Sequence, residues 1–150
     1  MFTGNYDILD DVKKSVISGK VDASFVVLRS NNTMLNTIAT TSYMLELTAS
    51  TPAKNAQIHK VGHSTGLTSG NVKETSVSIN LHNHTGQIVS ITDIISASYN
   101  SAEGDSGGLV YSISGSKRYP VGIHVGSDGK GIAFVAKTMN VNLDLGVARY

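Results

Sequence analysis

The sequence predicts an all-β fold, and three observations support this prediction. Fifteen of the 150 residues are glycine and only two are proline, while serine, threonine, valine and isoleucine are frequent. Apolar or β-branched runs recur at short spacing, and polar turn signals rich in glycine, serine and asparagine separate them. Helical periodicity is hard to find. Several short strands joined by regular turns are typical of a closed antiparallel barrel or a sandwich.

Each expected strand is a run of β-branched or alternating apolar residues between two turn signals. In chain order these runs cover residues 21–28, 43–48, 56–62, 73–80, 86–95, 108–114, 119–126 and 131–137. The turn signals between them include the stretches STP, TSGN, HNHTG, ISGSK and SDGKG. Two segments fit a helix: residues 137–145, as a short terminal helix, and residues 5–14, with a weak pattern.

Composition excludes several classes of site and partner. The chain has 12 Lys and Arg against 11 Asp and Glu and no block of like charge, so we expect no nucleic-acid and no membrane partner. The absence of cysteine excludes disulfides, thiol nucleophiles and thiolate metal sites. No apolar run approaches the ~20 residues of a membrane span, and the start MFTGNYDILDD lacks a signal-peptide pattern. The length suits one domain with one substantial core.

The stretch AEGDSGGLVY at residues 102–111 places Ser106 between glycines and directly after Asp105. A glycine-rich turn explains this composition without any chemistry. The stretch also fits the G-x-S-x-G elbow of α/β-hydrolases, but that motif needs a helix after the serine, then an acid, then a histidine. Here a strand–turn–strand pattern follows, and the single downstream histidine precedes the remaining aspartates. We therefore reject the hydrolase elbow.

Four segments, in the same chain order, resemble the chymotrypsin-like (PA clan) serine proteases. GDSGG is similar to the nucleophile loop, and YPVGIHVGSDGKGIAFVAK resembles the strands that line the specificity pocket. The latter is especially similar to the G-x-H-x-G-x-x-G-x-G-F pattern of viral 3C-like proteases and to the G-I-H of bacterial glutamyl endopeptidases. KVGHSTGLTSGNV resembles the K-x-G-x-T-T-G-x-T-x-G hairpin of bacterial and viral members, and KVDASFVVL resembles the strand that carries the catalytic aspartate.

This resemblance covers the chain from about residue 20 onward and implies an architecture. Residues 34–150 would form the six-stranded antiparallel C-terminal barrel of a chymotrypsin-like double barrel, with a short C-terminal helix. Residues 1–33 would be the last strands of the N-terminal barrel. The compartment stays open, although secreted or virus-associated proteins are favoured because both kinds of relative share these patterns.

The resemblance also implies catalytic residues. Ser106 would be the nucleophile, and the backbone N–H groups of Gly104 and Ser106 would form the oxyanion hole. Asp105 would brace the nucleophile loop against a partner that the sequence does not name. Asp22 would orient the general base, with Asp10 and Asp11 as the fallback.

A specificity pocket is implied as well. Ser101, His124 and Gly126 match positions that line the S1 pocket in glutamyl-specific and 3C-like enzymes, where the imidazole donates a hydrogen bond to the P1 side chain. A histidine packed in a strand is the alternative for His124. No aspartate that would hold Arg or Lys is expected in this pocket, so we expect Glu or Gln at P1.

The general-base histidine of the family precedes the aspartate, but residues 1–21 contain no histidine. All five histidines follow Asp22, and none is a natural base: His59, His63, His82, His84 and His124. A metal site at the His-x-His pair 82–84 is less plausible than a solvated turn, and we expect no metal and no cofactor. We therefore expect a complementary chain, or a missing N-terminal part, to supply the base.

Three functions remain open. The first is a serine endopeptidase subunit or fragment that cleaves protein or peptide substrates through an acyl-enzyme. The second is a catalytically silent, protease-like binding or structural module of a larger assembly. A rearranged site that uses His59 or His63 as the base is a remote third.

Overall fold

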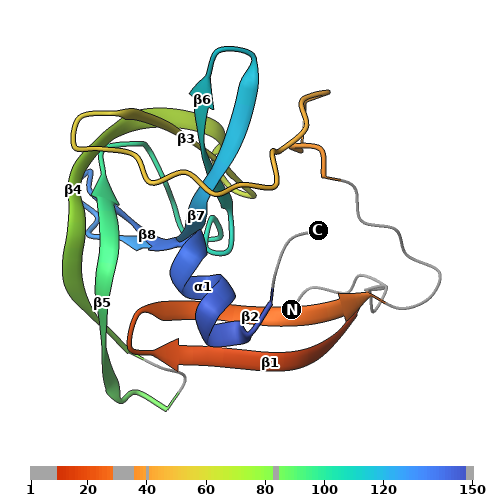
Figure 1. Ribbon diagram of the computed structural model, residues 1–150. Coiled ribbons are helices and arrows are strands. Elements are labelled where there is room, and N and C mark those ends of the chain that lie inside the picture. Colours follow the sequence, from red (N-terminus) through yellow and green to blue (C-terminus); the bar gives the residue numbers. More distant parts are fainter. Residues whose placement is uncertain (1–9, 29–35, 40, 83–84, 148–150) are drawn as a thin grey trace.

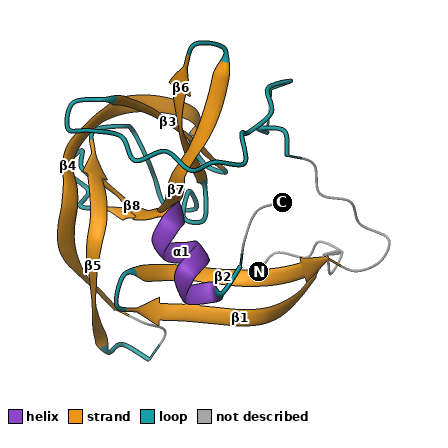
Figure 2. Cartoon of the chain, in the orientation of Figure 1, coloured by secondary structure: helices purple, strands orange, loops and turns teal. Residues whose placement is uncertain are grey.

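The computed structural model describes residues 10–28, 36–39, 41–82 and 85–147. Its elements are β1 (Asp10–Ser18), β2 (Val21–Leu28), β3 (Gln57–Gly62), β4 (Gly66–His82), β5 (Ile88–Ala97), β6 (Leu109–Ser114), β7 (Lys117–Ser127), β8 (Ala133–Lys137) and α1 (Thr138–Leu145). The predicted all-β class is confirmed, because strands dominate the described residues (Figures 1 and 2).

Strands β3 to β8 close into an antiparallel barrel with the strand order β3-β4-β5-β8-β7-β6. The barrel closes where β3 pairs with β6, with Lys60 opposite Val110. Closure leaves none of these six strands with a free edge. The prediction of a six-stranded antiparallel barrel is thus confirmed.

The apolar core of the barrel consists of side chains that alternate with outward-facing residues along the strands, all of them aliphatic except Tyr99. Each member of this core is at most 3% exposed: Ile58, Val72, Ile95, Ala97, Tyr99, Val110, Val121, Ala133 and Val135. Burying one valine or isoleucine side chain contributes about 1.5–3 kcal/mol. The core therefore gives the site a rigid support.

Two glycines in the barrel serve close backbone packing. Gly70 lies inside β4, where a Cβ would come within 2.4 Å of the Tyr99 nitrogen. At Gly122 in β7, a Cβ would come within 2.1 Å of the Ala136 carbonyl oxygen. The turn that the stretch TSGN predicted is therefore wrong: these residues continue β4, and glycine is required because the backbone of Ser98 and Tyr99, just after β5, passes closely.

Strands β1 and β2 form a separate two-stranded sheet beside the barrel (Figure 1). They join through a turn at Gly19, whose φ is +61°, with Ser18 paired to Val21. The helix that the pattern at residues 5–14 suggested is wrong for residues 10–14, which lie in β1, and residues 5–9 lie outside the described residues. Pairing with β2 decides the outcome, because a weak helical pattern without a packed face does not form a stable helix.

The hairpin is fixed to the barrel at its turn and along one face. The Gly19 carbonyl accepts a hydrogen bond from the Thr92 N–H at 2.7 Å, and Lys20 pairs with Asp93 at 3.7 Å. Asp93 has a positive φ of +55° in β5 and also bonds Lys137 and Asn140. A second apolar core joins the hairpin, barrel and α1: Val21, Val125, Ala136, Val141 and Leu145.

The segment 41–52 crosses the outside of the barrel without forming the strand expected at residues 43–48. Only isolated bridges occur, one between Leu45 and Arg118. The Glu46 N–H bonds the Arg118 carbonyl at 2.8 Å, and the Arg118 guanidinium lies 3.6 Å from the centre of the Tyr43 ring. The strand prediction failed because this segment touches β7 at single points rather than along a ladder.

Helix α1 confirms the terminal helix predicted for residues 137–145. It ends at Gly146, whose φ of +68° and backbone hydrogen bonds to Asn142 and Leu143 close the last turn. Its buried residues, Val141 and Leu145, face the hairpin core. At eight residues α1 is too short to cross a bilayer, and no other described segment forms a long apolar helix.

Candidate active site

The loop that carries Ser106 lies between β5 and β6, and its glycines fix its path. Gly104 and Gly107 have φ values of +93° and +85°, a region that L side chains rarely adopt. At Gly108 a Cβ would lie 2.6 Å from the Val61 carbonyl oxygen. The loop conformation therefore depends on glycine at these positions, and it leaves Ser106 exposed.

Asp105 anchors this loop in the barrel. It is fully buried and pairs with the equally buried Lys60, with 2.9 Å between Nζ and Oδ2. The N–H groups of Ser64, Thr65 and Ala102 donate to its carboxylate at 2.8–3.0 Å, and the Thr65 hydroxyl donates at 2.6 Å. Burial alone would raise the pKa of this carboxyl, but hydrogen bonds from Thr65 and Lys60 hold that pKa far below its usual range.

Lys60 is thus the partner of Asp105 that the sequence left unnamed. Ile58 and Lys60 alternate on β3 and are both buried, so the lysine side chain enters the barrel. A charge at an inward strand position needs a buried counter-charge. That signal is present in the stretch AQIHKVG, although it does not say where along the chain the counter-charge lies.

Within residues 104–108, the backbone N–H groups divide into three that have a backbone acceptor and two that have none among the described residues. The N–H groups of Asp105, Gly107 and Gly108 donate to backbone carbonyls at 2.9–3.1 Å. Within the part of the chain that the structure describes, those of Gly104 and Ser106 donate to nothing. These are the donors expected for the oxyanion hole, which requires free N–H groups beside the nucleophile.

The Ser106 hydroxyl donates to the Val125 carbonyl at 3.0 Å rather than to an imidazole. No histidine within the described ranges forms a hydrogen bond to it. Ser106 borders an open cavity of about 510 Å³, which the nucleophile loop lines together with Thr37, Ala39 and the β3 end. The cavity is large enough for several residues of a peptide chain.

His63 lines this same cavity. Its ring carbon Cδ2 lies 4.0 Å from the position that a Cβ on Gly104 would occupy. His63 and Ser106 therefore line one cavity, although the sequence offered none of the five histidines as a natural base. It makes no hydrogen bond to the serine among the described residues.

Asp22 lies on β2 immediately after the buried Val21 and is half-buried. Burial raises the pKa of its carboxyl. Among the described residues no group donates a hydrogen bond to this carboxylate, and Asp22 does not line the cavity at Ser106. The fallback residues Asp10 and Asp11 begin β1, at the hairpin end opposite the Gly19 turn.

Of the residues expected in the S1 pocket, Ser101 lines a cavity and His124 is buried in the barrel. Ser101 lines a cavity of about 140 Å³ together with Tyr99, Asn100, Ser127, Gly129 and Gly131. Gly126 adjoins this lining through Ser127 but does not line the cavity itself. His124 is 2% exposed and also does not line it.

His124 is held by a residue that sequence reasoning missed. The Tyr99 hydroxyl lies 2.9 Å from His124 Nδ1, with the two rings edge to face. Burial, followed by the nearby Lys60 charge, lowers the pKa of His124, while burial raises the pKa of Tyr99. A neutral ring that accepts the Tyr99 proton at Nδ1 carries its own proton on Nε2, which has no described partner.

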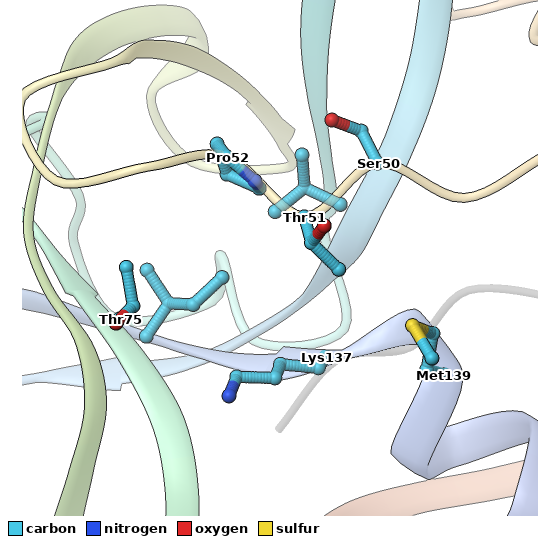
Figure 3. Close-up of a pocket in the computed structure, with 8 residues that line it drawn as sticks. Ser50, Thr51, Pro52, Thr75, Lys137 and Met139 are labelled. Carbon is cyan, nitrogen blue, oxygen red and sulfur yellow. The ribbon is translucent and has the colours of Figure 1, made fainter.

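A smaller cavity of about 70 Å³ lies elsewhere on the barrel, beside the start of α1 (Figure 3). Its lining includes Pro52, Ile95, Val121 and Met139, and the Lys137 side chain extends along it toward Thr75. None of the expected site residues lies there. The described residues contain no cluster of three or more His, Asp or Glu that could hold a metal, and His84 lies outside them.

Solved structures with the same fold are serine proteases. Thermobifida fusca Protease A matches with a TM-score of 0.72 and 19% identity, over 93% of this chain and 73% of that one. A glutamic-acid-specific serine protease described as using a histidine triad in substrate binding matches with a TM-score of 0.74 and 21% identity, over 96% and 75%. Nocardiopsis protease matches with a TM-score of 0.72 and 23% identity, over 94% and 74%. No family model and no curated sequence matches the chain. The likeness establishes a chymotrypsin-like fold.

Proposed function

We propose that this chain is the C-terminal part of a serine endopeptidase in which Ser106 attacks the scissile carbonyl. The observation that carries the proposal is the pair of N–H groups without acceptors, at Gly104 and Ser106, beside an exposed serine and an open cavity. In a folded protein each backbone N–H group is paired with a protein acceptor or with water. Here the two free donors belong to the residues that would hold a tetrahedral oxyanion.

In this mechanism the buried ion pair of Lys60 and Asp105 fixes the loop before substrate arrives. Ser106 forms the acyl-enzyme, the two N–H groups stabilise the oxyanion, and a histidine accepts the serine proton. Asp22 would orient that histidine. Its half-buried carboxylate, which has no described donor, is suited to accept the imidazole Nδ1–H.

We propose that polypeptide outside this sequence supplies the general base, from a complementary chain or from an N-terminal part. Residues 1–33 would then complete a second barrel with it, and residues 34–150 would be the C-terminal barrel. Within the described residues, β1 and β2 form a ladder only with each other, apart from the bridge between Gly19 and Ile91, and a two-stranded sheet of this kind can be extended by strand addition. Phe25 and Val27 share one face of this hairpin and are 38 and 41% exposed, while Val12, paired with Val26, lies on the other face and is 64% exposed. Further strands would cover this apolar surface.

The proposed P1 residue is Glu or Gln, recognised by His124 Nε2. The cavity that Ser101 and Tyr99 line would hold the side chain, and His124, which is bonded to the Tyr99 hydroxyl but does not line the cavity, would donate the hydrogen bond after a local rearrangement. Burial, followed by the nearby Lys60 charge, lowers the pKa of His124 and so favours the neutral ring, which suits an uncharged carboxamide. A P1 carboxylate would be bound better once the ring gains a proton.

A panel of peptides that differ only at P1 tests this specificity. We expect cleavage after Glu and Gln, and the ratio of kcat/KM for Glu over Gln should rise as the pH falls from about 8 to about 5.5. The ratio cancels the titration of the general base, which both substrates share. Preference for Arg, Lys or a large aromatic residue would refute the assignment of this pocket.

A fluorophosphonate probe tests the nucleophile itself. Native material, with every chain that co-purifies, should be labelled on Ser106, and labelling should disappear when the chain is isolated. His63→Ala should leave labelling unchanged, because His63 contributes only to the cavity wall in this proposal. Loss of labelling in His63→Ala would instead make His63 the base and contradict an external histidine.

A silent protease-like module is the second candidate. It is favoured by the hydrogen bond from Ser106 to the Val125 carbonyl, which occupies the proton that a general base would take. Absence of labelling in the presence of every co-purifying chain would select this candidate.

A further inference from the structure

The Ser64 hydroxyl lies against the peptide that joins Glu103 to Gly104. It donates a hydrogen bond of 2.5 Å to the Glu103 carbonyl oxygen. A Cβ on Gly104 would lie 2.4 Å from the Ser64 Oγ, so the two residues are in direct contact. Ser64 is itself held in place, because its N–H donates to the buried Asp105 carboxylate at 2.8 Å.

The direction of that carbonyl decides where the Gly104 N–H points. In a trans peptide the C=O and the following N–H point in opposite directions, and no described peptide is cis. With the Glu103 carbonyl turned toward Ser64, the Gly104 N–H is directed away from Ser64. It has no acceptor among the described residues, as the proposed oxyanion hole requires.

The same peptide has a second accessible orientation. A flip would carry φ of Gly104 from +93° to about −90°, and glycine adopts both regions at similar cost. In the flipped state the Glu103 carbonyl would take the place of the N–H, and an oxyanion would meet a partial negative charge instead of a donor. The loop therefore needs an interaction that selects one orientation.

We propose that Ser64 is a positioning residue that holds the Glu103–Gly104 peptide in the orientation that exposes the Gly104 N–H. Ser64 does not touch the substrate in this role. Its N–H is bonded to the buried Asp105 carboxylate, and its hydroxyl is bonded to the Glu103 carbonyl. Ser64 therefore links the fixed position of Asp105 to the orientation of the peptide that precedes the Gly104 N–H. The proposal rests on the proposed protease function for its catalytic consequence, but not for its structural one.

The structural test uses the isolated chain and does not require activity. Crystal structures of the wild type and of Ser64→Ala should differ in the Glu103–Gly104 peptide, which we expect to be flipped or mixed in the variant. Ser64→Thr, which keeps a hydroxyl, should retain the wild-type orientation. Because Ser64 is exposed, the alanine leaves no cavity and the fold should persist.

The kinetic test uses the native material with its co-purifying chains. Ser64→Ala should lower kcat by about tenfold, and by up to ~10²–10³ if the flip is complete, with KM nearly unchanged. Ser64→Thr should restore most of kcat. The matched control is Thr41→Ala, which removes another hydroxyl bonded to a backbone carbonyl, that of Ile38 at 2.9 Å, and should leave kcat at the wild-type value.

The two failures can be told apart. An unflipped peptide in Ser64→Ala, or an unchanged kcat in an active preparation, overturns the role of Ser64. A flipped peptide in a protein that is never labelled on Ser106 leaves Ser64 as the residue that orients this peptide and overturns the protease function alone.

Discussion

Lys60→Met should lower the free energy of unfolding by about 3–5 kcal/mol, because it leaves the Asp105 carboxylate buried without its counter-charge. Both side chains of the pair are 0% exposed, so water cannot replace the lost ammonium without opening the barrel. Denaturant unfolding followed by circular dichroism measures the change.

Two further variants test whether the loss of stability in Lys60→Met comes from the unpaired buried charge. Lys60→Met combined with Asp105→Asn removes both charges and should be more stable than the sum of the single effects predicts. Lys54→Met breaks the exposed pair with Glu74, whose side chains are 59 and 53% exposed, and should change stability by less than about 1 kcal/mol. An equal loss in Lys60→Met and Lys54→Met would show that the buried pair does not anchor the loop.

Ser106→Ala should reduce peptide cleavage by the native material by about 10³–10⁶-fold, since loss of a catalytic nucleophile removes nearly all of the covalent pathway. The side chain is exposed and makes one hydrogen bond, to the Val125 carbonyl, so stability should change little. Initial rates on a peptide with Gln or Glu at P1 give the measurement.

Ser116→Ala, in the turn between β6 and β7, is the control for exposed serines and should keep full activity. If Ser106→Ala retains more than a few per cent of the rate, another enzyme in the preparation or another nucleophile accounts for the cleavage.

The barrel could be predicted from the sequence because local pattern and tertiary structure agree along most strands. Residues 21–28 coincide with β2, and the predicted short helix differs from α1 by one residue. The expected strand at 43–48 and the turn at TSGN failed for one reason: whether a segment pairs along its length depends on neighbours distant in the chain. Gly70 illustrates this, since the Tyr99 backbone that demands it is 29 positions away.

The sequence predicted a set of candidate residues, and the structure adds contacts among their neighbours that the sequence did not predict. The glycine pattern pointed to Ser106 and Gly104, whereas Lys60, Ser64 and Tyr99 act through contacts made only in the folded chain. Each of these three is polar and ordinary in its local sequence. Their contacts depend on which side chains are buried and on where those side chains point in the folded chain, and the spacing of residues in the sequence does not give either.

The carboxylate of Asp93 affects how the protein unfolds in acid. Hydrogen bonds from Lys137, Asn140 and Ser76 lower its pKa to about 2, so the stability that it contributes is complete above its usual value of 3.8 and lost as the pH falls through about 2. Lys20 belongs to the hairpin turn and Asn140 to α1, so protonation loosens the seam between these elements and the barrel. We therefore expect acid below about pH 2 to weaken first the contacts that join the hairpin turn and α1 to the barrel, as a local unfolding unit.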